Sequence, residues 1–312
     1  MSSGDPVSSG HRSVLLHEAI DTLDIQKSDA VVDATLGGAG HAKEIVKKLG
    51  KKGTFIGFDL DHDAIERAQL VLKNSQCTTH LVESNFRGLD EELMKLGIEK
   101  IDKALFDLGW SSFQLDAGRG FSFQKDEPLL MTYAKEGSAL SAGTIVNTWS
   151  EESIADVIYG WGEERYSRRI AKRIVEEREK KPIATSQELG EIVRAAVPAM
   201  YRRGRIHPAT KTFQALRIAV NDELGALKEG IKAAWKNLSV DGRIAVISFH
   251  SIEDREVKRL LVQLAKENGQ LIFKKPIIAS DAEIKENPRA RSAKLRVIQK
   301  THDKTNISYQ SS

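Results

Sequence analysis

The feature that most constrains this chain is a short apolar strand that runs directly into a glycine-rich turn. Residues 30–35 (Ala-Val-Val-Asp-Ala-Thr) have the pattern of a buried strand, and the turn at 37–40 (Gly-Gly-Ala-Gly) leads into a helix that ends at Gly50. The alternation continues with strands at 53–59, 80–82 and 103–107 and a helix at 63–72. Strands and helices that alternate at this spacing predict the α/β class, with a parallel sheet covered by helices on both faces.

The alternation stops near Asp116. Between 116 and 208 the signals are helical and loop-like, and one amphipathic helix is predicted at 163–179. A single long helix is then predicted from Thr210, as its N-cap, to Leu238, and strands at 243–248, 271–273 and 294–298 complete the sheet. We therefore expect a Rossmann-like domain made of 11–115 and 209–300, an inserted, mainly helical domain at 116–208, a disordered leader at 1–10 and a flexible tail at 301–312.

Composition excludes several classes of protein. No apolar run approaches the ~20 residues of a membrane helix, and the N-terminus lacks the basic and apolar regions of a signal peptide. The only cysteine, Cys77, cannot form an internal disulfide, which favours a reducing compartment, so we expect a cytoplasmic protein that does not associate with membranes. No Cys/His cluster has metal-ligand spacing, so no metal is expected.

The net charge of +3 is too small to indicate a partner, but the charge is unevenly distributed. Six Lys or Arg and no acid fall between Arg194 and Arg217, and six more fall between Lys285 and Lys300 against the single Glu286. Such stretches favour one electropositive face, as in proteins that bind nucleic acid. Solvated surface charge is the alternative for either stretch alone.

An open α/β sheet binds its ligands beyond the carboxyl ends of its strands. Three acidic residues of this chain are predicted to lie at these ends. Asp33, Asp59 and Asp107 all fall there, beside the turn that begins at Gly37. Asp59 lies 19 residues after Gly40, about where nucleotide-binding folds place the acceptor for a ribose hydroxyl. This pattern fits nicotinamide oxidoreductases as well as enzymes that use S-adenosylmethionine.

Asp33 separates these two cofactor classes. A carboxylate next to the turn would repel a pyrophosphate, whereas S-adenosylmethionine has no phosphate and carries an ammonium and a sulfonium. The sequence therefore favours the methyl donor over NAD. The alternative for Asp33 is that its side chain only hydrogen-bonds its own turn.

Residues 107–116 (Asp-Leu-Gly-Trp-Ser-Ser-Phe-Gln-Leu-Asp) resemble a motif of the MraW-type ribosomal RNA small-subunit (cytosine-N4)-methyltransferases. Further blocks match this family in order from His11 to about Lys300: 120–123 (Gly-Phe-Ser-Phe), 162–165 (Gly-Glu-Glu-Arg), 207–210 (His-Pro-Ala-Thr), 212–217 (Thr-Phe-Gln-Ala-Leu-Arg), 221–224 (Asn-Asp-Glu-Leu), 248–255 (Ser-Phe-His-Ser-Ile-Glu-Asp-Arg) and 287–292 (Asn-Pro-Arg-Ala-Arg-Ser). One loop departs from the family pattern, because Leu130 and Thr132 stand where an acid and a base are usual.

The resemblance implies a class I methyltransferase fold with an inserted RNA-recognition domain, S-adenosylmethionine as cofactor, and methylation of the exocyclic N4 of a cytidine in small-subunit (16S-type) rRNA near the decoding site. The partner would be that rRNA or the small ribosomal subunit, and the sequence leaves a homodimer open. By position, the family's cofactor contacts fall on Ala39, Gly40, His41, Asp59, Phe86, Asp107 and Gln114, and Asp33 and Gly37 join them from the pattern above. Phe86 would stack on adenine, with packing in the core as the alternative.

The implied reaction needs help at the nucleophile. The amino nitrogen of cytosine is a poor nucleophile, so a hydrogen-bond acceptor at its N–H groups would favour attack and take a proton afterwards. Asp107 is the candidate, with Ser111 and Ser112 shaping the same loop, and the alternative is that Asp107 only binds the cofactor. Methylation of the ring carbon would need a cysteine nucleophile, and Cys77 lies outside every motif.

Two basic clusters are candidates for contacts with RNA phosphates, Arg202, Arg203 and Arg205 in one and Arg289 and Arg291 in the other. His250, Glu253 and Asp254 are expected at the rim of the pocket, with a structural strand-end network as the alternative. Three functions remain open. An RNA amino-methyltransferase is favoured over a nicotinamide oxidoreductase and over a non-catalytic ribosome-assembly factor, which the altered loop at 130–132 suggests.

Overall fold

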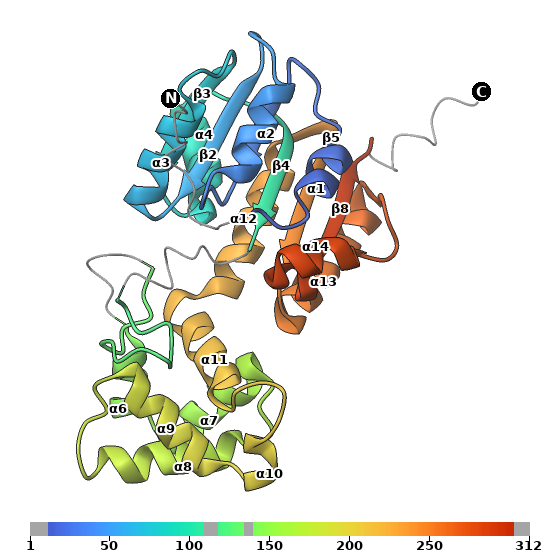
Figure 1. Cartoon of the computed structure of the whole chain (residues 1–312). Coiled ribbons are helices and arrows are strands. Elements are labelled where there is room, and N and C mark those ends of the chain that lie inside the picture. Colours follow the sequence, from blue (N-terminus) through green and yellow to red (C-terminus); the bar gives the residue numbers. More distant parts are fainter. Residues whose placement is uncertain (1–11, 109–117, 134–139, 303–312) are drawn as a thin grey trace. The chain divides into compact units, whose positions relative to one another are not determined.

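Two compact units make up the chain in the computed structural model (Figure 1), which describes residues 12–108, 118–133 and 140–302. Unit 1 is Met1–Ser111 with Leu224–Ser312, and unit 2 is Ser112–Glu223. The sequence placed the end of the inserted segment at 208, but unit 2 continues to Glu223 because helix α11 (Ala209–Asn221) packs against helix α7 (Glu151–Gly162). Gly162 permits this packing, since a Cβ there would lie 2.6 Å from the carbonyl oxygen of Lys211.

Unit 1 contains an eight-stranded sheet with the strand order β3-β2-β1-β4-β5-β8-β6, and β7 also pairs with β8. The strands are β1 (Ala30–Asp33), β2 (Thr54–Asp59), β3 (Thr78–Glu83), β4 (Ile101–Asp107), β5 (Leu238–Ser248), β6 (Gly269–Leu271), β7 (Ile277–Ile278) and β8 (Lys294–Lys300). The first five are parallel, and β8 runs antiparallel to its neighbours β5, β6 and β7. The parallel sheet predicted from the sequence is confirmed.

Helices cover both faces of this sheet because successive residues of each buried strand point in opposite directions. Val31 and Phe55 pack on one side, and their neighbours Val32 and Ile56 pack on the other. The first side is covered by α1 (Leu16–Leu23), α2 (Gly40–Lys48), α3 (His62–Leu72) and α14 (Asp281–Glu286), and the second by α4 (Leu89–Lys95), α12 (Glu223–Asn237) and α13 (Ser251–Glu267). Unit 1 is therefore a three-layer α/β structure, as predicted.

The order of the strands reverses between β1 and β4, which are neighbours in the sheet although two strands separate them in sequence. In open α/β sheets the crevice at such a reversal is where ligands bind, outside the carboxyl ends of the strands. Asp33 ends β1 and Asp107 ends β4, so both acids stand at this switch point.

Unit 2 is helical in its described part. Its helices are α6 (Ala142–Thr148), α7, α8 (Ser167–Arg178), α9 (Ser186–Ala196), α10 (Ala199–Arg202) and α11. Helix α8 packs against α7 and α9, and the buried side chains Ile158, Ile170, Ile174 and Leu189 lie among these helices. Ser141, Ser150 and Thr185 cap α6, α7 and α9 by accepting a backbone N–H.

Two helices predicted from the sequence differ from those in the structure, one in where it starts and one in its continuity. The stretch predicted at 163–179 begins only at Ser167, because Glu163 adopts a left-handed conformation (φ 50°) that ends α7. The long helix predicted from Thr210 to Leu238 starts at Ala209 and breaks at Asp222 (φ 45°), where α11 ends and α12 begins. Apolar spacing continues across Asp222, so periodicity alone does not reveal the break, although Asp enters this conformation more readily than most residues.

Among the described residues, none of the helices combines the length and the apolar character needed to cross a lipid bilayer.

Candidate functional site

Three carboxylates stand at the carboxyl ends of neighbouring strands, Asp33 on β1, Asp59 on β2 and Asp107 on β4. We call this group the acidic switch point. Asp33 is 1% exposed, and one of its carboxylate oxygens accepts the N–H of Thr35 at 3.1 Å. Burial raises the pKa of Asp33 well above its usual range, and the nearby negative charges of Asp107 and Asp59 raise it further. A positively charged ligand would relieve this repulsion.

The glycine-rich turn is tied to the end of β2 by Asp59. One carboxylate oxygen of Asp59 accepts the N–H of Gly37 at 2.8 Å, and the other accepts the N–H of Asp61 at 2.9 Å. Burial raises the pKa of Asp59, and the two N–H donors oppose that rise. Each carboxylate oxygen has two lone pairs, so Asp59 keeps acceptor capacity for a ligand hydroxyl while it holds the turn.

Two further contacts fix the shape of the turn. Leu36 donates its N–H to the carbonyl of Phe58 at 3.0 Å and packs over Gly57, where a Cβ would lie 2.6 Å from the Leu36 side chain. Gly37 and Ala39 have positive φ angles of 48° and 58°, and Ala39 is the N-cap of α2. The backbone that begins α2 is therefore held in a left-handed conformation that a residue with a Cβ rarely adopts.

His41 and Asp107 form a pair inside this site. His41 is 5% exposed; its Nε2 lies 3.2 Å from the carbonyl oxygen of Val14, and its Nδ1 lies 3.5 Å from a carboxylate oxygen of Asp107. A carbonyl only accepts, so Nε2 carries the hydrogen and Nδ1 of the neutral ring has a lone pair. Burial lowers the pKa of His41, although Asp107 opposes this. Burial therefore favours the neutral imidazole beside Asp107.

Asp107 is oriented from its backbone as well. Its N–H donates to the hydroxyl of Thr35 at 2.8 Å, and its side chain is 18% exposed. The partners Thr35 and Val14 were not identified from the sequence. Thr35 follows β1 and Val14 precedes α1, and no motif marks either position. Ser111, Ser112 and Gln114, which the sequence also assigned to this site, lie outside the described residues.

Phe86 follows β3 at the start of a short 3-10 helix (Phe86–Gly88). Its ring meets Phe106 edge to face at a centroid distance of 5.6 Å. It also packs on Gly230 of α12, where a Cβ would lie 2.5 Å from the ring. The core packing considered for Phe86 is therefore present, and its contact with adenine stays a prediction.

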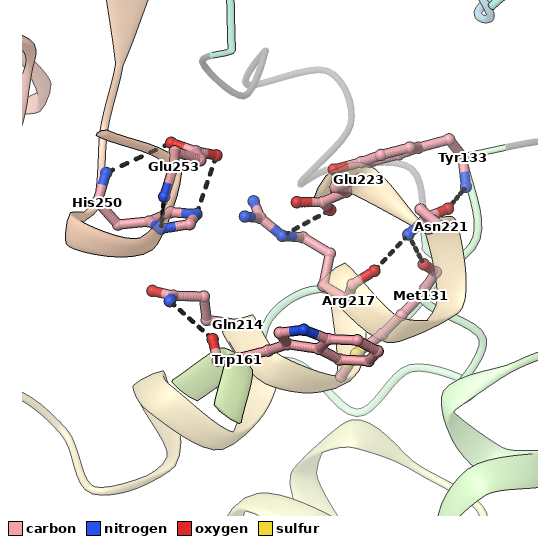
Figure 2. Close-up of polar contacts among 9 residues, drawn as sticks. All are labelled: Met131, Tyr133, Trp161, Gln214, Arg217, Asn221, Glu223, His250 and Glu253. Carbon is pink, nitrogen blue, oxygen red and sulfur yellow. Dashed lines mark hydrogen bonds and ion pairs between the residues drawn. The ribbon is translucent and has the colours of Figure 1, made fainter. Parts of the chain in front are cut away.

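The residues after β5 form a network within unit 1 (Figure 2). His250 caps α13 in a capping box: its Nδ1 accepts the Glu253 N–H at 3.3 Å, and Glu253 accepts the backbone N–H of His250 at 3.4 Å. Glu253 also accepts the N–H of Phe249 at 2.9 Å. The sequence left two roles open for His250 and Glu253, a structural network at the strand end or the rim of the pocket. The contacts of the structural network are present, and a role at the rim of the pocket stays a prediction.

Asp254 binds two bases on β8. It accepts hydrogen bonds from Arg296 at 2.7 Å and from Lys294 at 3.0 Å. Burial by itself would raise the pKa of Asp254, but these two cations hold it below its usual value. The basic stretch at 285–300 is thus partly neutralised within unit 1, which the sequence could not show.

The arginines assigned to RNA are exposed and lie in different units. Arg202, Arg203 and Arg205 belong to α10 of unit 2 and the loop after it, and Arg289 and Arg291 lie in a 3-10 helix (Pro288–Ser292) of unit 1. Within the described part of the chain none of the five forms an ion pair, although Arg202 donates to the carbonyl of Val197 at 3.2 Å. Exposed, unpaired cations of this kind are available to a polyanion.

The loop that departs from the family pattern is fixed by Asn221 within unit 2 (Figure 2). The Asn221 side chain accepts the N–H of Tyr133 at 2.9 Å and donates to the carbonyls of Met131 at 2.8 Å and Arg217 at 2.9 Å. Thr132 is buried and Leu130 is 41% exposed. The Asn-Asp-Glu-Leu block therefore has a structural role in holding this loop.

Comparison of the sequence with known proteins places this chain in one family. Residues 8–301 match the MraW methylase family. The chain is 46% identical to ribosomal RNA small subunit methyltransferase H of Clostridioides difficile (strain 630) over 93% of this chain and 98% of that protein. It is 44% identical to the protein of the same name from Paenibacillus sp. (strain JDR-2), over 93% and 99%. An rRNA methylase structure from Streptococcus thermophilus superposes with a TM-score of 0.43 at 13% identity, over 91% of this chain and 93% of that one.

Proposed function

This chain belongs to the MraW methylase family, and from that premise we propose that it transfers a methyl group from S-adenosylmethionine to the exocyclic N4 of a cytidine in small-subunit ribosomal RNA, near the decoding site. The observation that carries the proposal is the acidic switch point, where one buried and two partly buried carboxylates stand at the strand ends at which such a fold binds its ligand. Within this function we assign cofactor binding to unit 1 and recognition of RNA to unit 2.

The residues present fit a cationic cofactor. Asp33 is desolvated and surrounded by like charges, so it favours an ammonium or sulfonium and would repel a pyrophosphate. Asp59 has acceptor capacity left for ribose hydroxyls after binding the turn. These two acids support S-adenosylmethionine over NAD, the alternative that the glycine-rich turn left open.

When bound, S-adenosylmethionine supplies a methyl group on a positively charged sulfur, already activated for attack. Asp107 accepts a hydrogen bond from the cytosine amino group, which favours the positive charge that grows on that nitrogen, and it then takes the proton. Thr35 holds the backbone of Asp107 in place, and His41 presents the lone pair of Nδ1 to the carboxylate. Because burial lowers the pKa of His41, Asp107 rather than the imidazole holds this proton after transfer.

Attack by the amino nitrogen needs no cysteine nucleophile, whereas methylation of the ring carbon does. The single cysteine, Cys77, is buried and directly precedes β3, so it lies at the amino end of the parallel strands. Asp33, Asp59 and Asp107 lie at the opposite, carboxyl end. This placement supports chemistry at the amino group.

The proposal is tested by giving the purified protein methyl-labelled donor and small ribosomal subunits from a strain that lacks it, and then digesting the rRNA to nucleosides. Large subunits and tRNA serve as control acceptors. We expect label in N4-methylcytidine from the small subunit alone. Label in a ring-carbon or ribose methyl would contradict the proposed chemistry, and no label with any ribosomal particle would favour the assembly-factor alternative.

A further inference from the structure

A pocket on unit 2 is lined by residues of α7 and α8 and of the turn between them, and the proposed reaction does not use it. Two tyrosines and three arginines line it, together with the acid Asp156. We call its aromatic and basic part the arginine–tyrosine site, made of Tyr159, Arg165, Tyr166, Arg168 and Arg169. The three arginines are exposed, and Tyr159 is 66% exposed.

The arginines of this site differ from the two arginines that follow them on α8, Arg173 and Arg178. Arg173 binds Glu177 at 2.7 Å and Glu176 at 3.4 Å, and Arg178 donates to two backbone carbonyls. Arg165, Arg168 and Arg169 have no carboxylate partner among the described residues. Since Asp156 is the one acid among the described residues that line the pocket, the site carries a net positive charge.

Contacts with Arg165 and Glu164 hold Tyr166 of this site and the neighbouring Tyr201 in place. The Arg165 guanidinium lies over the ring of Tyr166 at 4.8 Å and over that of Tyr201 at 5.3 Å. Both tyrosines are anchored on Glu164, which is fully buried: it accepts the Tyr201 hydroxyl at 2.5 Å and the Tyr166 N–H at 2.8 Å. Burial and this hydrogen bond raise the pKa of Tyr201, so its hydroxyl stays a donor.

Guanidinium groups that have no carboxylate partner among the described residues, next to the exposed ring of Tyr159, offer the contacts that single-stranded RNA binds. Arginines contact phosphates, and aromatic faces and guanidinium planes stack on unpaired bases. The site is continuous with the basic cluster at 202–205, because the rings of Tyr166 and Tyr201 meet at 5.0 Å and Arg202 follows Tyr201 directly. An acidic protein surface would match the charge but would leave Tyr159 without a partner.

We propose that the arginine–tyrosine site binds single-stranded ribosomal RNA, with Arg165, Arg168 and Arg169 at the phosphates and Tyr159 stacked on a base. This inference rests on the proposed function, and it extends RNA contact beyond the arginines at 202–205. Binding is not sequence-specific by this chemistry, because every base offers a π face and every nucleotide a phosphate. The site would therefore hold the substrate rather than select the cytidine.

The test measures binding of a protein-free small-subunit rRNA transcript to the full-length protein, without donor, across a series of salt concentrations. The variant R165Q/R168Q/R169Q should bind with a salt dependence shallower by about 2, since each lost phosphate contact removes about 0.7 from the slope. The charge-preserving variant R165K/R168K/R169K should keep the slope. R173Q, which removes an arginine already paired on the same helix, is the matched control and should behave as wild type.

A second pair of variants tests the base contact. Tyr159→Ala should lower the affinity about fivefold or more, and Tyr159→Phe should retain it, because stacking needs the ring and not the hydroxyl. Thermal unfolding of each variant establishes that it is folded. An unchanged slope in folded R165Q/R168Q/R169Q would overturn the site and leave the methyltransferase assignment intact. Wild-type protein that binds RNA but transfers no methyl group would defeat the proposed function and leave the site standing.

Discussion

The charged groups of unit 1 and unit 2 are arranged in opposite ways. At the acidic switch point of unit 1, burial raises the pKa of the Asp33 and Asp59 carboxylates. In unit 2, by contrast, Arg168 and Arg169 of α8 and Arg202 of α10 are exposed to solvent. A small cation is bound tightly by desolvated carboxylates fixed on strand ends, since the low dielectric strengthens each interaction. A long polyanion needs many solvent-exposed cations instead.

The largest effect is expected from Asp107→Asn, which keeps the shape of the side chain but removes its charge and halves its acceptor capacity. If Asp107 assists the amine, methyl transfer at saturating donor should fall by about 10²-fold or more while donor affinity hardly changes. Single-turnover rates and calorimetric titration of the donor measure the two quantities. Asp102→Asn is the matched control, because Asp102 lies at the other end of β4 and accepts the Ala30 N–H at 2.8 Å. Recovery of the rate by saturating donor would mean that Asp107 only binds the cofactor.

Asp59→Ala should weaken binding of S-adenosylmethionine by about 1–3 kcal/mol through the loss of hydrogen bonds to ribose hydroxyls and of the anchor for Gly37. Isothermal titration gives this value directly. Asp59→Asn keeps one acceptor and should fall between wild type and Asp59→Ala. A folded Asp59→Ala protein with wild-type donor affinity would remove Asp59 from the cofactor site.

The basic cluster after α10 is tested by the triple variant R202A/R203A/R205A. If these residues contact RNA phosphates, the salt dependence of RNA binding should become shallower by about 0.7–0.9 for each lost contact, with donor affinity unchanged. The same titration on the variant R289A/R291A shows whether the two clusters contribute alike. A slope identical to that of wild type would identify the cluster at 202–205 as solvated surface charge.

The smallest effect is expected from Asp33→Asn, and it concerns stability. Because the folded pKa of Asp33 is raised, the unfolded chain loses this proton at a lower pH than the folded chain does, so stability falls as pH rises through that window. At neutral pH the donor-free variant should therefore be more stable than wild type by ~1 kcal/mol, or about 2–4 °C in Tm. The gain should vanish in acid, and added donor should stabilise the variant less than wild type. A lower Tm for Asp33→Asn at neutral pH would contradict the account of a repelled, buried charge.

Much of unit 1 could be predicted from the sequence, because each strand is a short apolar run and each acid stands at the end of one. The strand β1, the turn at Gly37 and the positions of Asp59 and Asp107 all follow from local pattern. The pairing of His41 with Val14 and Asp107 joins distant segments, so no local pattern reveals it.

Unit 2 was less predictable for a related reason. The break at Asp222 preserves apolar spacing on both sides, and only its backbone angle marks it. Whether an arginine is free depends on its neighbours in space. The spacing of Arg173 from Glu176 and Glu177 indicates their pairing, but no spacing shows that Arg178 donates to the distant carbonyls of Val146 and Trp149.

The central claim is that unit 1 carries out the transfer and unit 2 holds the RNA. Steady-state kinetics with small ribosomal subunits as the varied substrate test it most directly, with Asp107→Asn and R165Q/R168Q/R169Q measured side by side. We predict that Asp107→Asn lowers kcat by about 10²-fold or more at an unchanged KM. The arginine variant should raise KM for the subunits and leave kcat near that of wild type. If both variants change the same kinetic parameter, the claim that unit 1 carries out the transfer and unit 2 holds the RNA is wrong.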